Sequence, residues 1–307
     1  MTTFNLLQNL RELTDLRRFF AARRTAIKHK YVFGIFRKTL LNRTMQTWVG
    51  SRGAYIQIER GRYFYIPKEL ELHGITILTR GLDDNYLAAY LARICKPAST
   101  VIDIGANIGE MSVTFAEAVG PNGRVVAFEP IPFLADAITK TARINAYDHL
   151  TVVNAAVSVN SGTLHIDVRY SPDKIVDSGG SQVKQFPTGA SVPVETFTLD
   201  AWCSANQSPN TDISLIKIDV EGHELQVLQG ARRTLTDHKP ALALEIGHES
   251  QQNRAEIAEI LDEIGYSPSA VMFRAGFLPV TWDEIVLMDG PLEKGGGYNI
   301  LFQCSPC

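Results

Sequence analysis

The sequence predicts an α/β protein with a doubly wound, mainly parallel sheet, and three observations support this prediction. Apolar runs at 100–104, 124–128, 150–157, 213–219 and 240–246 have the length and composition of strands buried on both faces. Helix-patterned segments follow most of these runs, at about 110–119, 131–146, 221–236 and 251–264. A glycine turn, Asp103-x-Gly105-x-x-x-Gly109, joins the first of these strands to the helix that follows. This alternation indicates a parallel sheet covered by helices on both sides.

Residues 1–81 are expected to form an N-terminal extension. Apolar residues at helical spacing predict an amphipathic helix over 4–24; they are Leu6, Leu10, Leu13, Leu16 and Phe20. Residues 1–43 contain ten Lys and Arg against two Asp and Glu, so this arm is basic while the remainder is acidic. We expect the arm to pack on the main domain or to form a homodimer, with contact to a membrane surface or an anionic partner as the alternative.

The extension ends in a predicted hairpin, because short strands at 54–59 and 62–67 flank Arg60-Gly61. A helix at 84–94 then leads into the main domain, which we place at 82–307. Late strands are expected at 270–273 and 299–303. Residues 170–191 are rich in Gly, Ser and Pro, and we expect this loop to close over the substrate.

The bulk composition of the 307 residues is that of a soluble globular protein, with 45% hydrophobic and 21% charged residues. No apolar run reaches the roughly 18 residues of a membrane span, and we expect no signal peptide. Of the four cysteines, at 95, 203, 304 and 307, the last two form a C-x-x-C, but it has no partner pair or histidine cluster, so we expect no metal or redox role there. Together these features predict a cytoplasmic protein. The acidic main domain argues against a nucleic-acid partner.

The turn at Asp103 predicts the ligand chemistry. Gly105 and Gly109 let a ligand approach the backbone, but their spacing is not that of the dinucleotide-binding fingerprint. A carboxylate at the strand tip suits an amino-bearing ligand, such as the amino-acid end of S-adenosylmethionine. Glu129 ends the next strand about twenty residues later, where an acidic side chain can accept hydrogen bonds from both hydroxyls of a ribose.

Together these features resemble the class I S-adenosylmethionine-dependent methyltransferases, and further motifs resemble the FkbM family. The resemblance covers roughly residues 82–302. The motifs that carry it are Asp103-Ile104-Gly105-Ala106-Asn107-Ile108-Gly109, Phe128-Glu129-Pro130, Asn154-Ala155-Ala156-Val157 and Lys217-Ile218-Asp219-Val220-Glu221-Gly222-His223-Glu224. It implies a Rossmann-like sheet of about seven strands, with the last strand antiparallel. It also implies methyl transfer to an oxygen, commonly a hydroxyl of a sugar, glycan or secondary metabolite.

The cofactor contacts that follow from these motifs lie at the tips of the first four core strands. They are Asp103, Gly105, Ala106, Asn107, Gly109, Glu129, Pro130, Asn154, Ala156 and Asp219. Asn154 and Ala156 are assigned by position alone, because the end of the third strand is where class I enzymes hold adenine.

Catalytic candidates lie at the tips of the fourth and fifth strands, and they are Lys217, Asp219, Glu221, His223, Glu245 and His248. His223 and His248 are candidate bases, because an imidazole ordinarily titrates near neutral pH. Glu221 and Glu224 have an alternative interpretation as first-turn residues of a helix. Asp219 and Glu245 could hold a divalent cation, but the sequence lacks the Asp-Asn pair of many Mg²⁺-dependent methyltransferases, so we expect no metal.

Three other functions remain as alternatives. A nucleotide-dependent oxidoreductase would use a similar sheet, but its glycine spacing differs. A non-catalytic binding protein would not need Asp103, Gly105, Gly109 and Glu129 together. A nucleic-acid amino-methyltransferase usually carries an Asn/Asp-Pro-Pro-aromatic motif after the fourth strand, where this chain has Asp219-Val220-Glu221-Gly222.

Overall fold

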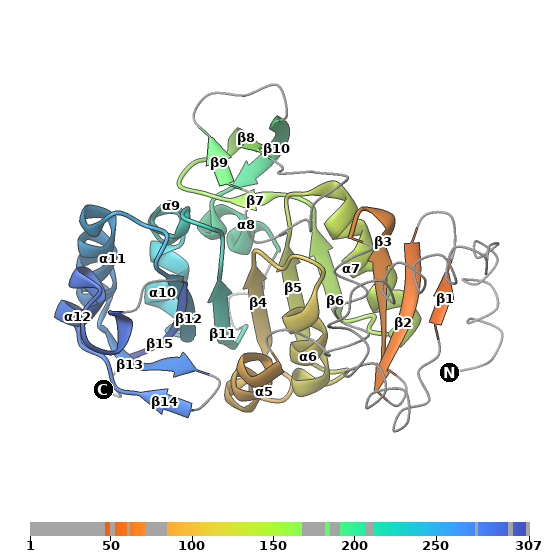
Figure 1. Cartoon of the computed structure of the whole chain (residues 1–307), viewed down its shortest axis with the longest axis horizontal. Helices are drawn as coiled ribbons and strands as arrows, with labels where there is room; N and C mark the ends of the chain where they lie inside the picture. Colours follow the sequence, from red (N-terminus) through yellow and green to blue (C-terminus); the bar gives the residue numbers. More distant parts are fainter. Residues whose placement is uncertain are drawn as a thin grey trace, which may run out of the picture.

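An eight-stranded sheet with helices on both faces forms the centre of the computed structural model (Figure 1). The residues that the structure describes are 47–49, 53–59, 62–70, 85–167, 182–184, 191–206, 211–273, 276–293 and 297–304. The expectations for the basic arm, including its helix over 4–24, and for most of the loop over 170–191 lie outside these residues. Among the helices described, none has the length and apolar composition needed to cross a bilayer.

The strand order of the central sheet is β14-β13-β15-β12-β11-β4-β5-β6. Its members are β4 (Thr100–Ile104), β5 (Arg124–Phe128), β6 (Leu150–Val153), β11 (Ile213–Ile218), β12 (Ala241–Ile246), β13 (Tyr266–Phe273), β14 (Gly276–Leu278) and β15 (Tyr298–Cys304). The strands from β12 to β6 are parallel, and β15 runs antiparallel to both of its neighbours. The predicted mainly parallel sheet with an antiparallel last strand is therefore confirmed, and the short hairpin strand β14 adds an eighth member.

Alternate residues of each central strand pack on opposite faces of the sheet. One face is covered by α5 (Asn85–Ile94), α6 (Glu110–Val119) and α7 (Pro132–Asn145). The other is covered by α8 (Leu199–Asn206), α9 (Glu224–Gln229), α10 (Arg232–His238), α11 (Gln251–Ile264) and α12 (Trp282–Leu287). In β4, Val101 packs toward the α5–α7 face while Ile102 and Ile104 pack toward the other. Because successive side chains of a strand alternate between the two faces, Asp103 lies on the α5–α7 side of the sheet at the tip of β4.

The predicted hairpin is present as β2 (Gly53–Glu59) and β3 (Arg62–Pro67), with β1 (Thr47–Val49) beside β2 and a short 3-10 helix, η1 (Lys68–Leu70), after β3. It lies against α7, where the Tyr65 N–H donates to Thr141 Oγ1 at 3.0 Å. Phe64 and Ile66 are buried in the same core as α5 and α6. The described part of the N-terminal extension therefore shares its hydrophobic core with the main sheet.

A second sheet of four strands begins where β6 ends. Its order is β7-β10-β8-β9, with β7 (Ala156–Val157), β8 (Gly162–Asp167), β9 (Gln182–Lys184) and β10 (Ser191–Phe197). In Figure 1 it lies above the upper ends of β4, β5 and β6. The strand expected over 150–157 is therefore two strands in different sheets. The chain turns between them at Asn154, whose side chain donates to backbone carbonyls at the end of β5. The loop expected over 170–191 contains β9.

The helix expected over 221–236 is also divided in two and begins later than predicted. Glu221 and Gly222 have φ angles of 57° and 95°, which lie outside the helical region. Helix α9 therefore begins at Glu224, and a break at Gly230 separates it from α10. A Cβ at Gly230 would lie 2.1 Å from the Ser158 carbonyl oxygen, so this break lets the chain between β7 and β8 approach closely. A 3-10 helix, η3 (Gly290–Leu292), precedes β15.

Candidate active site

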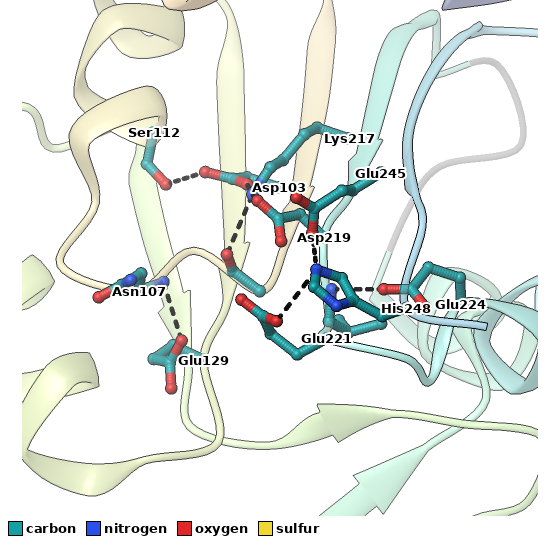
Figure 2. Close-up of polar contacts among 12 residues, drawn as sticks. Asp103, Asn107, Ser112, Glu129, Lys217, Asp219, Glu221, Glu224, Glu245 and His248 are labelled. Atoms are coloured by element: carbon teal, nitrogen blue, oxygen red, sulfur yellow. Dashed lines mark hydrogen bonds and ion pairs between the residues drawn. The ribbon is translucent and has the colours of Figure 1, made fainter. Parts of the chain in front are cut away.

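The polar residues predicted for the site come together because their strands are in register. Lys217 on β11 lies beside Asp103 on β4 and beside Ala243 on β12. Glu245 is two residues beyond Ala243 on β12 and therefore shares its face. Figure 2 shows Asp103, Lys217, Asp219 and Glu245 side by side. Carboxyl ends of neighbouring parallel strands are the usual position of ligand sites in open α/β sheets.

Asp103 is completely buried, and its carboxylate has two close partners. The Ser112 hydroxyl on α6 donates to Asp103 Oδ2 at 2.5 Å, and Lys217 Nζ lies 3.5 Å from Oδ1. Within the described residues, Oδ1 receives no hydrogen bond. A buried carboxylate oxygen without a hydrogen bond is costly, so this atom can accept a hydrogen bond from a ligand.

The turn at residues 105–109 packs closely against the backbone where the 219–222 segment begins. Gly105 has φ 78°, and a Cβ there would lie 1.8 Å from the Asp219 carbonyl oxygen. Its N–H and that of Ala106 both donate to the Phe128 carbonyl at 3.0 Å, while Lys217 Nζ donates to the Gly105 carbonyl at 3.1 Å. These contacts explain why the first glycine of the motif is required, and they connect the tips of β4, β5 and β11.

Glu129 follows β5 and closes the other side of this turn. Its carboxylate accepts from the backbone N–H of Asn107 at 2.8 Å and from that of Ile131 at 2.9 Å. Burial raises the pKa of Glu129 to about 7, although the two N–H donors oppose the rise. The Asn154 amide donates to the Glu129 carbonyl at 2.9 Å and to the Pro130 carbonyl at 3.0 Å. The tips of β5 and β6 are thereby held together beside the turn.

Ala156 has a different environment from the one predicted. It lies on β7, where it is buried against Ile166 and Val194 of the second sheet. Its expected position at the end of the third core strand came from reading residues 150–157 as one strand. Ala156 therefore has a packing role, and Asn154 is the residue of this pair that remains at the strand tip.

Four side chains form what we call the acceptor cluster: Asp219, Glu221, Glu245 and His248. His248 Nε2 lies 3.5 Å from Glu221 Oε2 and 3.9 Å from Glu245 Oε2. One donor atom from each of these three residues lies within 4.8 Å of the other two. Figure 2 shows the four side chains pointing toward one another, Glu245 from β12 and the other three from the segments after β11 and β12. The sequence predicted each residue, but not that His248 would join the two strand tips.

The charges of the acceptor cluster depend on Lys217 and on burial. Burial alone would lower the pKa of Lys217, but the nearby carboxylates of Asp219 and Asp103 raise it above its ordinary value, so the side chain is charged. Lys217 Nζ lies 3.2 Å from Asp219 Oδ2 and lowers the pKa of that carboxyl against the effect of burial. Burial, followed by the Asp219 charge, raises the pKa of Glu245 to about 10. The adjacent carboxyl groups of Asp219 and Glu245 therefore differ: Asp219 ionises more readily than an ordinary carboxyl group, and Glu245 less readily.

The second candidate base, His223, has another environment. Its Nε2 lies 2.9 Å from the Ser158 hydroxyl, and burial lowers its pKa to about 4. His223 is therefore neutral at physiological pH and connects the start of α9 to the chain between β7 and β8 of the second sheet. The structure favours His248 over His223 as the imidazole at the acceptor cluster.

Glu224 lies in the first turn of α9, as the alternative interpretation expected, whereas Glu221 lies in the turn before that helix. The hydrogen bonds that Glu224 accepts were not predicted. Its buried Oε1 accepts from the backbone N–H of Val220 at 3.0 Å and of Gly222 at 3.2 Å. Burial and the neighbouring Glu249 raise the pKa of Glu224 to about 9. The side chain thus holds the 219–222 turn that carries Asp219 and Glu221.

Two further residues of the site were not predicted. Ser112 had a weak signal, since it is the polar residue among the otherwise apolar buried residues of α6. Gly297 lies where a Cβ would be 2.1 Å from Glu245 Oε1 and 3.1 Å from His248 Nε2. Its approach to the acceptor cluster depends on the path of the chain before β15, which no local pattern specifies.

Comparison with known proteins identifies one family model, the methyltransferase FkbM domain, which matches residues 103–277. Hexuronic acid methyltransferase AglP from Haloferax volcanii is 31% identical over 133 residues, covering 43% of this chain and 50% of that protein. The 2-O-methyltransferase NoeI from Sinorhizobium fredii is 29% identical over 153 residues, covering 46% and 60%. The aligned regions thus span about half the length of these relatives.

Among solved structures, methyltransferase FkbM from Methylobacillus flagellatus aligns at 17% identity with a TM-score of 0.42. The alignment covers 77% of this chain and 55% of that protein.

Proposed function

The chain belongs to the FkbM family of methyltransferases, and on that premise we propose that it transfers a methyl group from S-adenosylmethionine to a hydroxyl oxygen of a sugar or another polar small molecule. The observation that carries the proposal is the pair of buried carboxylates, Asp103 and Glu129, on either side of the turn at residues 105–109. The family match gives no support to the oxidoreductase alternative.

In this proposal, the cofactor lies along the tips of β4, β5 and β6. Asp103 Oδ1, which lacks a hydrogen bond in the described residues, accepts from the cofactor's amino group. Glu129 accepts from the ribose hydroxyls, and Asn154 lies at the position expected for adenine. The backbone of Gly105, Ala106 and Gly109 provides the close approach that the cofactor needs.

The acceptor hydroxyl is placed at the acceptor cluster, beside the cofactor's methyl group. Its oxygen attacks the methyl carbon, so an O–C bond forms as the S–C bond breaks and its electron pair goes to sulfur. The cofactor leaves as S-adenosylhomocysteine, and the hydroxyl proton leaves through the acceptor cluster. Aligning oxygen, carbon and sulfur is the principal catalytic task of the protein, and assisting proton loss is the second.

The acceptor class is supported by two lines of reasoning. The relatives named above act on a hexuronic acid and at a 2-O position, respectively, according to their names. The acceptor cluster contains three carboxyl groups and an imidazole, which suit the hydroxyls of a polar acceptor better than an apolar ring. We therefore propose a hydroxyl-rich acceptor, with a sugar or glycan as the first choice.

Binding and transfer can be tested on the full chain. S-Adenosylhomocysteine is expected to raise the melting temperature while NAD leaves it unchanged. Incubation with trideuteromethyl S-adenosylmethionine and a panel of hexuronic acids and amino sugars should then yield a product that carries the labelled methyl group. An increase in melting temperature with NAD but not with S-adenosylhomocysteine would overturn the proposed function.

A further inference from the structure

Three side chains of the acceptor cluster, Glu221, Glu245 and His248, have the arrangement of a metal-binding triad. Glu221 lies in the turn after β11, Glu245 is the penultimate residue of β12, and His248 lies in the loop that follows. Their donor atoms lie within 4.8 Å of one another, which permits one ion to contact all three after small side-chain movements. Two carboxylates and an imidazole are ligands used by divalent ions such as Mn²⁺ and Mg²⁺.

One further observation points to a ligand at this position, and a second shows how the side chains are held there. Glu245 Oε2 is buried, and no residue in the described part of the chain donates a hydrogen bond to it. The backbone at Gly297 packs tightly against Glu245 and His248, since a Cβ there would lie 2.1 Å from Glu245 Oε1 and 3.1 Å from His248 Nε2. These two side chains can therefore take their positions only beside a glycine.

The surrounding charge favours a cation. Asp103, Asp219, Glu221 and Glu245 supply four carboxyl groups to this region, and Lys217 contacts two of them, Asp103 and Asp219. The carboxyl groups of Glu221 and Glu245 lie 3.5 Å and 3.9 Å, respectively, from His248 Nε2. A divalent ion bound here would replace the proton that Glu245 otherwise retains, and it would reduce the repulsion between the Glu245 carboxylate and those of Asp219 and Glu221.

We propose that Glu221, Glu245 and His248 bind a divalent cation of the Mg²⁺ or Mn²⁺ class, which holds the oxygens of the acceptor. This deepens the proposed function and rests on it, because the ion lies where the acceptor hydroxyl is placed. The ion would lower the pKa of a hydroxyl that it holds, so the proton would leave through the acceptor cluster to solvent before or during attack on the methyl carbon. A neighbouring hydroxyl of the same sugar can take a second coordination position.

We expected no metal from the sequence, and the proposed site differs from the pair of residues considered there. Asp219 and Glu245 were the considered ligands, but Asp219 is paired with Lys217 and is not one of the three grouped donors. His248 takes its place, because the loop after β12 returns the imidazole to the strand tips.

The test measures Mn²⁺ binding to the tag-free, EDTA-treated full chain by electron paramagnetic resonance. One Mn²⁺ per chain is expected, with Mg²⁺ competing for it. Glu245→Gln and His248→Ala should each weaken Mn²⁺ at least about tenfold. Glu259→Gln on α11 and His238→Ala on α10 are matched controls that should keep wild-type affinity.

A second variant, Gly297→Ala, tests the same site without removing a ligand. Its added methyl group should displace the Glu245 carboxylate and weaken Mn²⁺, while the melting temperature shows that the chain is folded. No Mn²⁺ binding to the wild type, or equal binding to all variants, overturns the metal site. S-Adenosylhomocysteine binding, measured in parallel by calorimetry, distinguishes this result from a failure of the proposed function, because it does not depend on the ion.

Discussion

At the scale of single residues, Glu129 offers the most direct test of cofactor binding. We predict that Glu129→Gln weakens S-adenosylhomocysteine by roughly 1.5–3 kcal/mol, because the variant lacks the charged acceptor for the ribose hydroxyls. Calorimetry measures this loss, and Glu195→Gln, an exposed position on β10, provides the control. Wild-type affinity in a folded Glu129→Gln protein would show that the ribose is held elsewhere.

The pH dependence of binding follows from the same side chain. Burial raises the pKa of Glu129 to about 7, so the carboxylate that we propose accepts from the ribose forms as the pH rises through that value. Affinity should therefore increase about tenfold between about pH 6 and pH 8. In the ligand-free protein the sign is opposite: the raised pKa means that stability falls as the pH rises from the ordinary carboxyl value toward 7. Both effects should be absent from Glu129→Gln.

At the scale of elements, the turn at residues 219–222 depends on the first residue of α9. Glu224→Ala would leave the N–H groups of Val220 and Gly222 without their acceptor, at a cost of about 1–3 kcal/mol. Glu224→Gln retains an oxygen at the same position and should be close to the wild type. Denaturant unfolding measures the stability, and methyl transfer measures the position of Asp219 and Glu221. Equal effects of the two substitutions would exclude the hydrogen bonds as the cause.

The turn after β4 depends on the absence of a side chain at Gly105. Gly105→Ala should destabilise the protein more than Gly120→Ala, although the two glycines have similar φ angles of 78° and 72°. The difference is the Asp219 carbonyl, 1.8 Å from a Cβ at 105, whereas nothing lies within 4 Å of a Cβ at 120. Comparing the free energies of unfolding of the two variants separates close approach from backbone strain. Equal values would contradict the close approach.

At the scale of the whole molecule, the hairpin β2–β3 belongs to the same core as the main sheet. We predict that Phe64→Ala destabilises the protein by about 3–5 kcal/mol, because the ring is fully buried with α5 and α6. Phe277→Ala is the matched control, since that ring is 46% exposed. A single unfolding transition that shifts in Phe64→Ala would show that hairpin and sheet unfold together. An unshifted transition would mean that the hairpin is independent.

Much of the fold could be predicted from the chain itself. The central strands were predicted because their apolar runs are long and continuous, and α11 because its pattern spans the whole element. The predicted bounds of a strand or helix were wrong where a contact with a distant part of the chain determines where that element ends. Residues 150–157 divide at Asn154, where the side chain bonds to the end of β5, and α9 and α10 divide where Gly230 meets Ser158.

By itself, the sequence determined which residues could carry the chemistry. The acidic residues at the ends of apolar runs and the glycines of the first turn are local patterns, and the family match agrees with them. Only the tertiary structure decided which of these side chains meet. The register of β4, β11 and β12 brings Lys217 beside Asp103. The loop after β12 brings His248 back to Glu221 and Glu245, and Gly297, just before β15, packs against Glu245 and His248. These contacts join residues far apart in the chain, so their geometry depends on strand order and packing.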